Sequence, residues 1–383
     1  MMKIDVTPTT GPAIGGGSFP PGCSPLCRAC DHRSLSREES EAQKRGWLAS
    51  KLAPWADRLA SLEGATETES WGYRDRVRLH VRHVNGRWRF GMLLGDELLP
   101  LEDCPVHSSR VRRSLALLGR ILPDDPLLPL AFYAQSGAQA TLIVKSRTRP
   151  DLTWTKRLDE GGAESGLEGL WLHLHPSAGR RLFANREWIL LWGQKRSQDT
   201  RGLVYGPCAF QQLLPRLYER SLDEAEAFLA PRRDDAAVDL YCGNGASLAR
   251  WLRRGAAVVG VELSGEAMEN AAVNGPGASL LRGCCAERIP QLDSFLSPHA
   301  RSRRLAYVNP PRTGLEPEVA RWLPRAGFRR IAYLSCSAGT LRRDMTLLEE
   351  AGYDVLRLRP YDFFPRTRHV ECLALLSSRD DRP

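Results

Sequence analysis

The hydrophobic positions of this chain change their spacing along its length. In residues 36–62 apolar side chains recur every three or four positions, which predicts an amphipathic helix with its tryptophans in the core. These apolar positions are Trp47, Leu48, Leu52, Trp55 and Leu59. In residues 76–82 every second residue is apolar, and the Asn85-Gly86 pair that follows is typical of a tight β-hairpin. Strand-like runs continue beyond this hairpin, so residues 64–204 are predicted to form a β-rich middle domain.

The last part of the chain alternates between apolar runs and helical segments. The apolar runs that we interpret as buried strands are residues 238–240, 256–261, 305–308, 330–334 and 370–376. Strands that alternate with helices build a mainly parallel sheet covered by helices. We therefore expect an α/β fold, with a Rossmann-like C-terminal domain over residues 205–383.

The composition is that of an ordinary soluble protein, with 42% hydrophobic and 26% charged residues in a chain of 383. No uninterrupted apolar run reaches about 18 residues, so no membrane span is expected. Residues 1–22 are rich in Gly, Pro, Ser and Thr and lack the apolar core of a signal peptide. We expect a flexible tail there, on a cytoplasmic and monomeric protein.

Basic residues exceed acidic ones by 54 to 45, which gives a net charge of +9. The arginines cluster in three places: Arg110, Arg112 and Arg113; Arg301, Arg303 and Arg304; Arg366 and Arg368. Such clusters form either a solvated surface or a surface that follows the phosphates of a nucleic acid. Charge alone does not decide between these two interpretations.

Ten cysteines are present, and three of them crowd into one short segment within residues 23–63. Cys23, Cys27 and Cys30 lie close together in the sequence, and Cys104 stands alone further on. Four thiolates are a suitable ligand set for a four-iron cluster or for zinc. Unrelated free thiols are the alternative, and the spacing leaves all three possibilities open.

A glycine loop follows the first predicted strand of the C-terminal domain. Gly243 and Gly245 allow the backbone to turn sharply after Leu240, and the next strand ends in Glu262. A carboxylate at that place can accept hydrogen bonds from ribose hydroxyls. The third glycine of a dinucleotide-binding loop is missing, so the pattern favours S-adenosylmethionine over a dinucleotide.

Chemically reactive residues stand at the ends of the later strands. Cys336 follows a short apolar run, as a displayed nucleophile does, and Glu371 begins the last apolar run. Asn309 opens an Asn-Pro-Pro sequence, which enzymes that methylate exocyclic amines also use. A nucleophile, a carboxylate base and a nucleotide-type loop together indicate covalent catalysis with a bound cofactor, but they leave the target atom open.

Four motifs in register resemble the RNA uracil-5-methyltransferase family. They are residues 239–245, 309–314, 335–344 and 363–371. Residues 72–77 and 101–106 extend the resemblance over nearly the whole chain after residue 22. The pattern is closest to the 23S ribosomal RNA branch that carries an iron–sulfur cluster but no TRAM domain.

This resemblance implies a mechanism and a role for individual residues. Cys336 would add to C6 of a uracil, the methyl group would come from S-adenosyl-L-methionine, and Glu371 would remove the proton from C5. The implied cofactor contacts are Gln212, Tyr241, Glu262 and Asn309. The implied ligands of a four-iron, four-sulfur (4Fe-4S) cluster are Cys23, Cys27, Cys30 and Cys104.

The chain departs from the family pattern on the cofactor side. Leu214 and Ala246 replace asparagines that are usual there, and Cys284-Cys285 replaces a usual Gly-Asp. An acid expected near the adenine is therefore lost or moved to Glu287. These departures leave the strength of cofactor binding open.

Three functional classes follow from these observations. The leading one is a uracil-5-methyltransferase acting on 23S rRNA, with tRNA as the alternative substrate. A cytosine C5 enzyme is disfavoured, because residues 309–312 lack the second cysteine that those enzymes use. The third is a catalytically weak RNA-binding paralogue, against which the presence of Cys336 and Glu371 argues.

Overall fold

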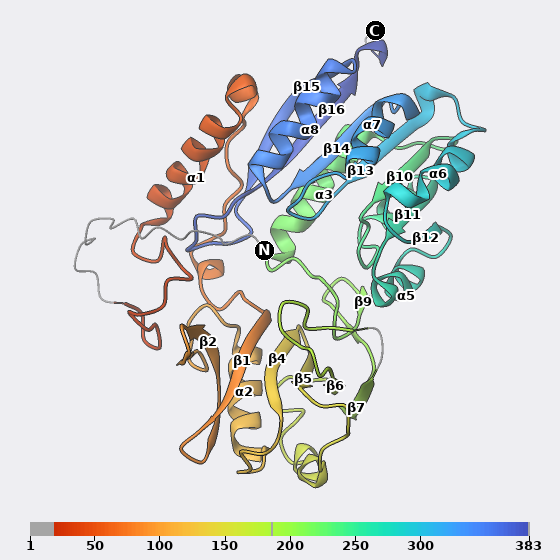
Figure 1. The fold of residues 1–383 in the computed structure, drawn as a ribbon. Helices are drawn as coiled ribbons and strands as arrows, with labels where there is room; N and C mark the ends of the chain where they lie inside the picture. The colour runs from red at the N-terminus through yellow and green to blue at the C-terminus, as the bar shows by residue number, and fades with distance from the viewer. Residues whose placement is uncertain (1–18, 185–186, 382–383) are drawn as a thin grey trace.

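The computed structural model describes residues 19–184 and 187–381. Two seven-stranded sheets dominate the molecule, one in the middle of the chain and one in its C-terminal part (Figure 1). Most of the expected tail, residues 1–18, lies outside the described residues. Within the described part of the chain, no helix is long and apolar enough to cross a membrane.

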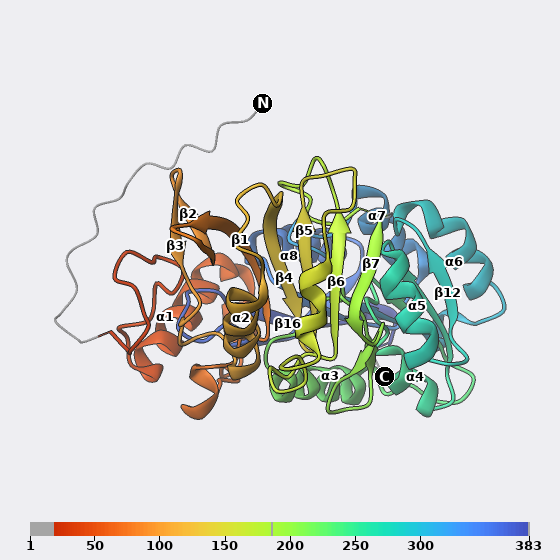
Figure 2. The same cartoon turned by 90° about the horizontal axis from the view of Figure 1, so that it is seen from below.

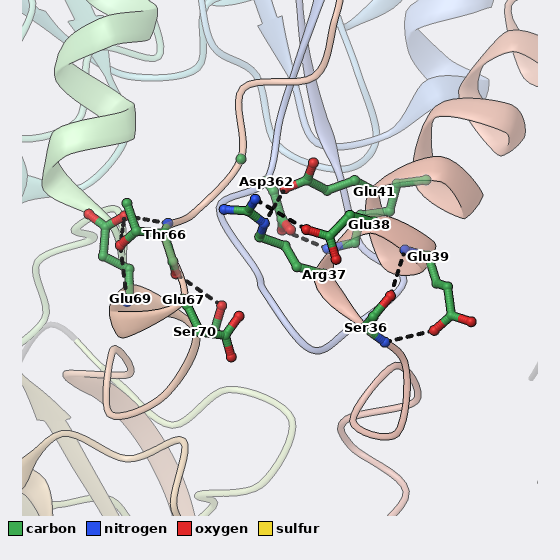
Figure 3. Close-up of polar contacts among 12 residues, drawn as sticks. Ser36, Arg37, Glu38, Glu39, Glu41, Thr66, Glu67, Glu69, Ser70 and Asp362 are labelled. Carbon is green, nitrogen blue, oxygen red and sulfur yellow. Dashed lines mark hydrogen bonds and ion pairs between the residues drawn. The ribbon is translucent and has the colours of Figure 1, made fainter. Parts of the chain in front are cut away.

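Helix α1 (Arg37–Lys51) begins with a capping box. The Ser36 hydroxyl accepts a hydrogen bond from the Glu39 N–H at 3.1 Å, and the Glu39 carboxylate accepts one from the Ser36 N–H at 2.8 Å (Figure 3). The helix ends earlier than predicted, because Pro54 cannot donate a backbone hydrogen bond and the chain continues as the 3-10 helix η1 (Ala53–Arg58). The tryptophan prediction is confirmed for Trp55, which is buried, but is wrong for Trp47, which is 45% exposed.

The middle sheet has the strand order β3-β2-β1-β4-β5-β6-β7 (Figure 2). Its strands are β1 (Arg76–Val84), β2 (Arg87–Leu94), β3 (Glu97–Pro100), β4 (Leu130–Ser136), β5 (Gln139–Val144), β6 (Gly169–Leu174) and β7 (Trp188–Gly193). The predicted hairpin joins β1 to β2, with Asn85 at φ 50° and Gly86 at φ 74°. Helix α2 (Ser109–Ile121) packs on the face that carries Val77 and Leu79.

Short elements connect the middle sheet to its surroundings. They are the 3-10 helices η2 (Thr68–Ser70) and η3 (Thr153–Leu158) and the two-stranded sheet of β8 (Ser197–Gln198) and β9 (Val204–Tyr205). The β-rich character expected for this part of the chain is present.

The C-terminal sheet has the order β12-β11-β10-β13-β14-β16-β15. Its strands are β10 (Ala236–Leu240), β11 (Ala257–Glu262), β12 (Ser279–Arg282), β13 (Arg304–Val308), β14 (Arg330–Ser335), β15 (Tyr353–Tyr361) and β16 (Glu371–Ser378). The helices of this part are α3 (Pro215–Leu229), α4 (Leu248–Arg253), α5 (Gly265–Asn274), α6 (Ile289–Leu296), α7 (Pro317–Ala326) and α8 (Ala338–Glu350), with 3-10 helices η4 (Ala286–Arg288), η5 (Arg301–Arg303) and η6 (Arg379–Asp381).

The five strands from β12 to β14 are parallel, and β16 is antiparallel to both of its neighbours. The prediction that strands and helices alternate to the end is therefore wrong for the last two strands, which follow one another without a helix. In the β14–β16 register, Ser335 lies opposite Cys372. This register brings the end of β14 beside the beginning of β16.

Helix α1 and the 3-10 helix η1 pack on the C-terminal sheet. Leu48, Leu52, Trp55 and Leu59 belong to the same buried cluster as the apolar residues of β14, β16 and α8. The buried Lys44 ammonium donates to the Asp362 carboxylate at 2.6 Å and to the Phe364 carbonyl at 3.2 Å. A buried ion pair thus fastens α1 to the loop that precedes β16.

The Lys44→Met substitution removes one partner of this ion pair and leaves the Asp362 charge buried without compensation. We expect the free energy of unfolding to fall by about 3–5 kcal/mol in chemical denaturation. Lys51→Met, at the exposed end of the same helix, is the control and should change it by less than about 0.5 kcal/mol. If Lys44→Met is as stable as that control, the ion pair does not hold α1 in place.

Candidate active site

One cavity of about 790 Å³ lies where the C-terminal sheet faces β1 of the middle sheet. It is lined by every residue that the sequence predicted for catalysis or cofactor binding: Gln212, Tyr241, Glu262, Asn309, Cys336 and Glu371. These residues come from loops and strand ends far apart in the sequence. The fold therefore collects the predicted groups around a single space.

The β14–β16 register brings Cys336 and Glu371 together. Cys336 directly follows the last residue of β14, and Glu371 is the first residue of β16. Since Ser335 lies opposite Cys372, the next step of an antiparallel ladder places Cys336 opposite Glu371. The thiol is half-buried, and the carboxylate is fully buried at 4% exposure.

Burial raises the pKa values of both Cys336 and Glu371. Burial raises the pKa of the Cys336 thiol, the Glu371 charge raises it further, and Arg312 acts in the opposite sense. Burial raises the pKa of Glu371 to about 7, against the opposing effects of a Gln212 hydrogen bond and of Arg312. A carboxyl group that titrates near neutrality can take up and release a proton under ordinary conditions.

The glycine loop between β10 and α4 has an unusual backbone. Tyr241 has a positive φ of 61°, and Gly245 has a φ of 82° with its Cα so close to α5 that a Cβ would lie 2.9 Å from the Ala271 Cα. Glycine is the residue that accepts both constraints. Glu262 closes the loop, because its carboxylate accepts hydrogen bonds from the Gly243 N–H at 3.1 Å and the Ser264 N–H at 2.8 Å.

Two polar groups in the cavity wall have no partner within the described residues. The side-chain oxygen of Gln212 and the hydroxyl of Tyr307 are buried without a hydrogen bond. Gln212 donates from its nitrogen to the Glu371 carboxylate at 3.5 Å. Unsatisfied buried polar atoms beside a carboxylate and a glycine loop fit a nucleoside-type ligand, so the residues present are compatible with S-adenosylmethionine.

The two cysteines that replace the family's usual Gly-Asp lie in the cavity wall, as their place in the motif suggested. The acid in that part of the wall is not Glu287. Cys284 and Cys285 line the cavity, whereas the exposed Glu287 is not among its lining residues. Glu316, at the N-cap of α7, lines it instead. The Glu316 carboxylate accepts hydrogen bonds from the Tyr241 hydroxyl and from the Cys284 thiol, the latter at 2.9 Å.

Three residues of the cavity wall were not given a role by sequence reasoning. Arg312 and Glu316 stand in or beside the Asn-Pro-Pro motif, so that motif carried a signal for them. Arg76 lies in an alternating strand and in the motif of residues 72–77, which marked the position without giving it a role. Leu214 is buried in the core of the C-terminal part, and Ala246 lines the cavity.

The four predicted cluster ligands are near one another. The charges of Cys104, Cys27 and Cys23 add to the effect of burial that raises the pKa of Cys30 to about 11. The chain around them is tightly packed, since a Cβ on Gly22 would lie 2.1 Å from the Asp103 carbonyl oxygen. In the described residues, however, no group of three or more His, Cys, Asp or Glu side chains is arranged to hold a metal ion.

Comparison with known proteins addresses the family of the chain. A family model described as tRNA (Uracil-5-)-methyltransferase matches residues 299–379. The 23S rRNA (uracil(1939)-C(5))-methyltransferase RlmD of Shewanella putrefaciens is 26% identical over 364 residues, which cover 91% of this chain and 79% of that protein. An RlmD of a Marinomonas species is 28% identical, with 92% and 79% covered. The chain is thus similar over nearly its whole length to RNA uracil-5-methyltransferases. The resemblance found in the sequence motifs is thereby confirmed.

The fold comparison agrees with this assignment. The chain superposes on a Pyrococcus abyssi tRNA (uracil-54, C5)-methyltransferase, solved with S-adenosyl-L-homocysteine, with a TM-score of 0.68. The match covers 92% of this chain and 86% of that one at 20% identity. The chain therefore has the α/β fold that its sequence predicts.

Proposed function

We propose that this chain methylates C5 of one uridine in RNA, and that the RNA is 23S ribosomal RNA. The observation that carries the proposal is the meeting of Cys336 and Glu371 in one cavity with the glycine loop and Glu262. The RlmD relatives support ribosomal RNA as the substrate class. We further propose that the protein acts as a cytoplasmic monomer.

Transfer RNA is the alternative substrate, and the structural likeness to the Pyrococcus abyssi tRNA enzyme favours it. The two substrates would use the same chemistry, because both present a uracil that must leave its stack to enter the cavity. Mapping 5-methyluridine in the ribosomal and transfer RNA of a deletion strain decides between them.

The proposed mechanism begins at the sulfur of Cys336. Its thiolate forms a bond to C6 of the uracil, and the electron pair of the C5–C6 double bond moves toward O4 to give an enolate. Arg312 favours the thiolate, because its guanidinium opposes the effect of burial on the thiol pKa. The enolate carbon C5 then accepts a methyl group and carries both the methyl group and its original hydrogen.

Glu371 completes the reaction as the base. Its carboxylate removes the C5 proton, the electron pair re-forms the C5–C6 double bond, and the bond from C6 to sulfur breaks. The low-dielectric surroundings that raise the Glu371 pKa to about 7 also make its carboxylate a stronger base than an exposed one. The products are a 5-methyluridine, the Cys336 thiolate, protonated Glu371 and the S-adenosylhomocysteine that remains of the methyl donor.

S-adenosylmethionine, when bound, supplies an electrophilic methyl group. We propose that Glu262 accepts the ribose hydroxyls, that Tyr241 packs beside the nucleoside, and that Gln212 and Asn309 stand between cofactor and uracil. All four residues line the cavity. The unpaired side-chain oxygen of Gln212 supports its role as an acceptor for a ligand group.

We propose in addition that Cys23, Cys27, Cys30 and Cys104 hold a 4Fe-4S cluster. The support is the proximity of the four thiols and their family pattern. The cluster would fasten the N-terminal segment to the loop that follows β3, which contains Cys104. Its role would be structural, because the methylation needs no redox step. Structural metal groups contribute to folding in this way in small cysteine-rich segments.

The Cys336→Ala variant tests the nucleophile. We expect wild-type protein to form a denaturation-resistant complex with RNA that carries 5-fluorouridine at the target, because fluorine cannot leave C5 as a proton does. Cys336→Ala should form no such complex and should lose methyl transfer, while it keeps RNA affinity in a filter-binding assay. Cys372→Ala is the control, since that thiol is buried in β16 and does not line the cavity. Full turnover by Cys336→Ala would refute the assignment.

The Glu371→Gln variant tests the base. We expect a methylated RNA–protein complex to accumulate, detectable as methyl label on the complex in a denaturing gel, because the amide cannot take the C5 proton. For the wild type, turnover should fall as the pH decreases below about 7, since the raised pKa leaves Glu371 protonated there. Wild-type turnover by Glu371→Gln would show that another group is the base.

The cluster is tested by anaerobic purification. We expect brown protein with broad absorption near 400 nm and about four irons per chain. Cys104→Ser should lose the colour and become more sensitive to proteolysis in residues 23–35, whereas Cys208→Ser should keep the colour. Colourless protein with one zinc per chain would contradict the cluster and leave the methyltransferase proposal intact.

A further inference from the structure

Two arginines of β1 stand in the wall of the cavity without an acidic partner. Arg76 and Arg78 line it together, on the face of β1 opposite to Val77. Both guanidinium groups contact aromatic rings: that of Arg76 lies 4.4 Å from the centre of the Phe210 ring, and that of Arg78 lies 5.4 Å from the centre of the Phe183 ring. Among the described residues, no carboxylate forms an ion pair with either one.

The acid that adjoins Arg76 in the sequence is already engaged. Asp75, between these arginines and Arg74, forms an ion pair with Arg110 and accepts a hydrogen bond from Ser108. Burial lowers the pKa of Arg76 to about 10, and the charges of Arg78 and Arg74 act in the same direction. A partly buried cation surrounded by other cations is unfavourable in the free protein.

The three arginine clusters found in the sequence differ from Arg76 and Arg78, because they form ion pairs with acidic residues. Each contains a member paired with an acid: Arg110 with Asp75, Arg303 with Asp235, Arg366 with Glu67 and Arg368 with Asp31. Their charge is partly neutralised within the protein. Two other arginines line the cavity, but Arg201 is paired with Asp199 and Glu219, and Arg312 acts on Cys336 and Glu371. The cavity guanidinium groups left for an outside anion are therefore those of β1.

We propose that Arg76 and Arg78 bind the backbone phosphate of the nucleotide whose base enters the cavity. Guanidinium groups bind phosphate oxygens through paired hydrogen bonds, and the absence of a protein carboxylate leaves their donors free for this. Both arginines line the same cavity as Cys336, the proposed nucleophile. This inference rests on the proposed function, because it takes RNA as the ligand.

The test measures binding of an oligoadenylate of about 12 nucleotides that carries one central uridine, by fluorescence anisotropy at several salt concentrations. A second probe has neutral methylphosphonate linkages on both sides of that uridine. We expect wild type to bind the neutral probe about tenfold more weakly, the loss of one charged hydrogen-bonded contact. The double variant Arg76→Gln/Arg78→Gln should bind both probes equally, and its slope of affinity against salt should decrease by about 0.7 for each lost phosphate contact.

The control is Arg112→Gln, an exposed arginine of α2 on the opposite side of the middle sheet. It should still distinguish the two probes. The thermal unfolding midpoint of the double variant should stay close to that of wild type, because the loss of the contacts with Phe210 and Phe183 is offset by the removal of a buried charge beside Arg74. A large fall would indicate a structural role and overturn the proposal.

The remaining outcomes separate this inference from the proposed function. If wild type binds both probes equally but forms the 5-fluorouridine complex with RNA, the phosphate site is refuted and the methyltransferase proposal stands. If wild type binds neither probe and forms no complex with ribosomal or transfer RNA, both are refuted.

Discussion

The reversed direction of β16 is the constraint on which the candidate site depends. In a fully parallel sheet, the beginning of every strand lies at the edge opposite to the catalytic loops. Because β16 runs antiparallel between β14 and β15, its first residue lies at the edge where β14 ends. Glu371 thereby lies beside Cys336 without a long loop. The hydrogen bonds between β14 and β16 hold the two positions in place.

The loop that leads into β16 is held from several sides by the N-terminal part of the chain. Lys44 binds Asp362, and the Tyr73 hydroxyl donates to the Pro365 carbonyl at 3.0 Å. The Asp31 carboxylate accepts from the Arg368 N–H at 2.8 Å. The cysteine-rich segment is thus connected to the loop next to Glu371. Through this connection, the proposed cluster in the cysteine-rich segment could affect the position of Glu371 without lining the cavity.

Burial has opposite consequences for the two reacting groups. Burial raises the pKa of both groups, which strengthens Glu371 for its proposed role as base but makes the Cys336 thiolate harder to form. Arg312 favours the charged form of both groups. We infer that a bound substrate, through its own contacts with the thiolate and the cavity, completes the activation that the free protein provides only in part.

Much of this site could be predicted from the sequence, because its residues stand at strand ends marked by apolar runs. The strand before Cys336, the glycine loop and Glu262 follow from local pattern alone. The pairing of Cys336 with Glu371 came from the family motifs, since the direction of β16 is a tertiary property that no local spacing encodes.

Other features needed the structure. Trp47 follows the same helical spacing as Trp55, and only the position of α1 on the sheet decides which of them is buried. Glu316 and Arg76 come to the cavity from an N-cap and from another sheet, so their proximity depends on long-range packing. Glu287, which is closer in sequence to the departure at Cys284, is exposed.

The central claim is that methyl transfer occurs at C5 and releases the C5 hydrogen. The most direct measurement uses RNA transcribed with [5-³H]uridine and counts tritium released to water beside methyl groups incorporated from S-adenosylmethionine. The account predicts one tritium released for each methyl group transferred, and none without the cofactor. Methyl incorporation without tritium release would place the reaction at another atom and contradict it.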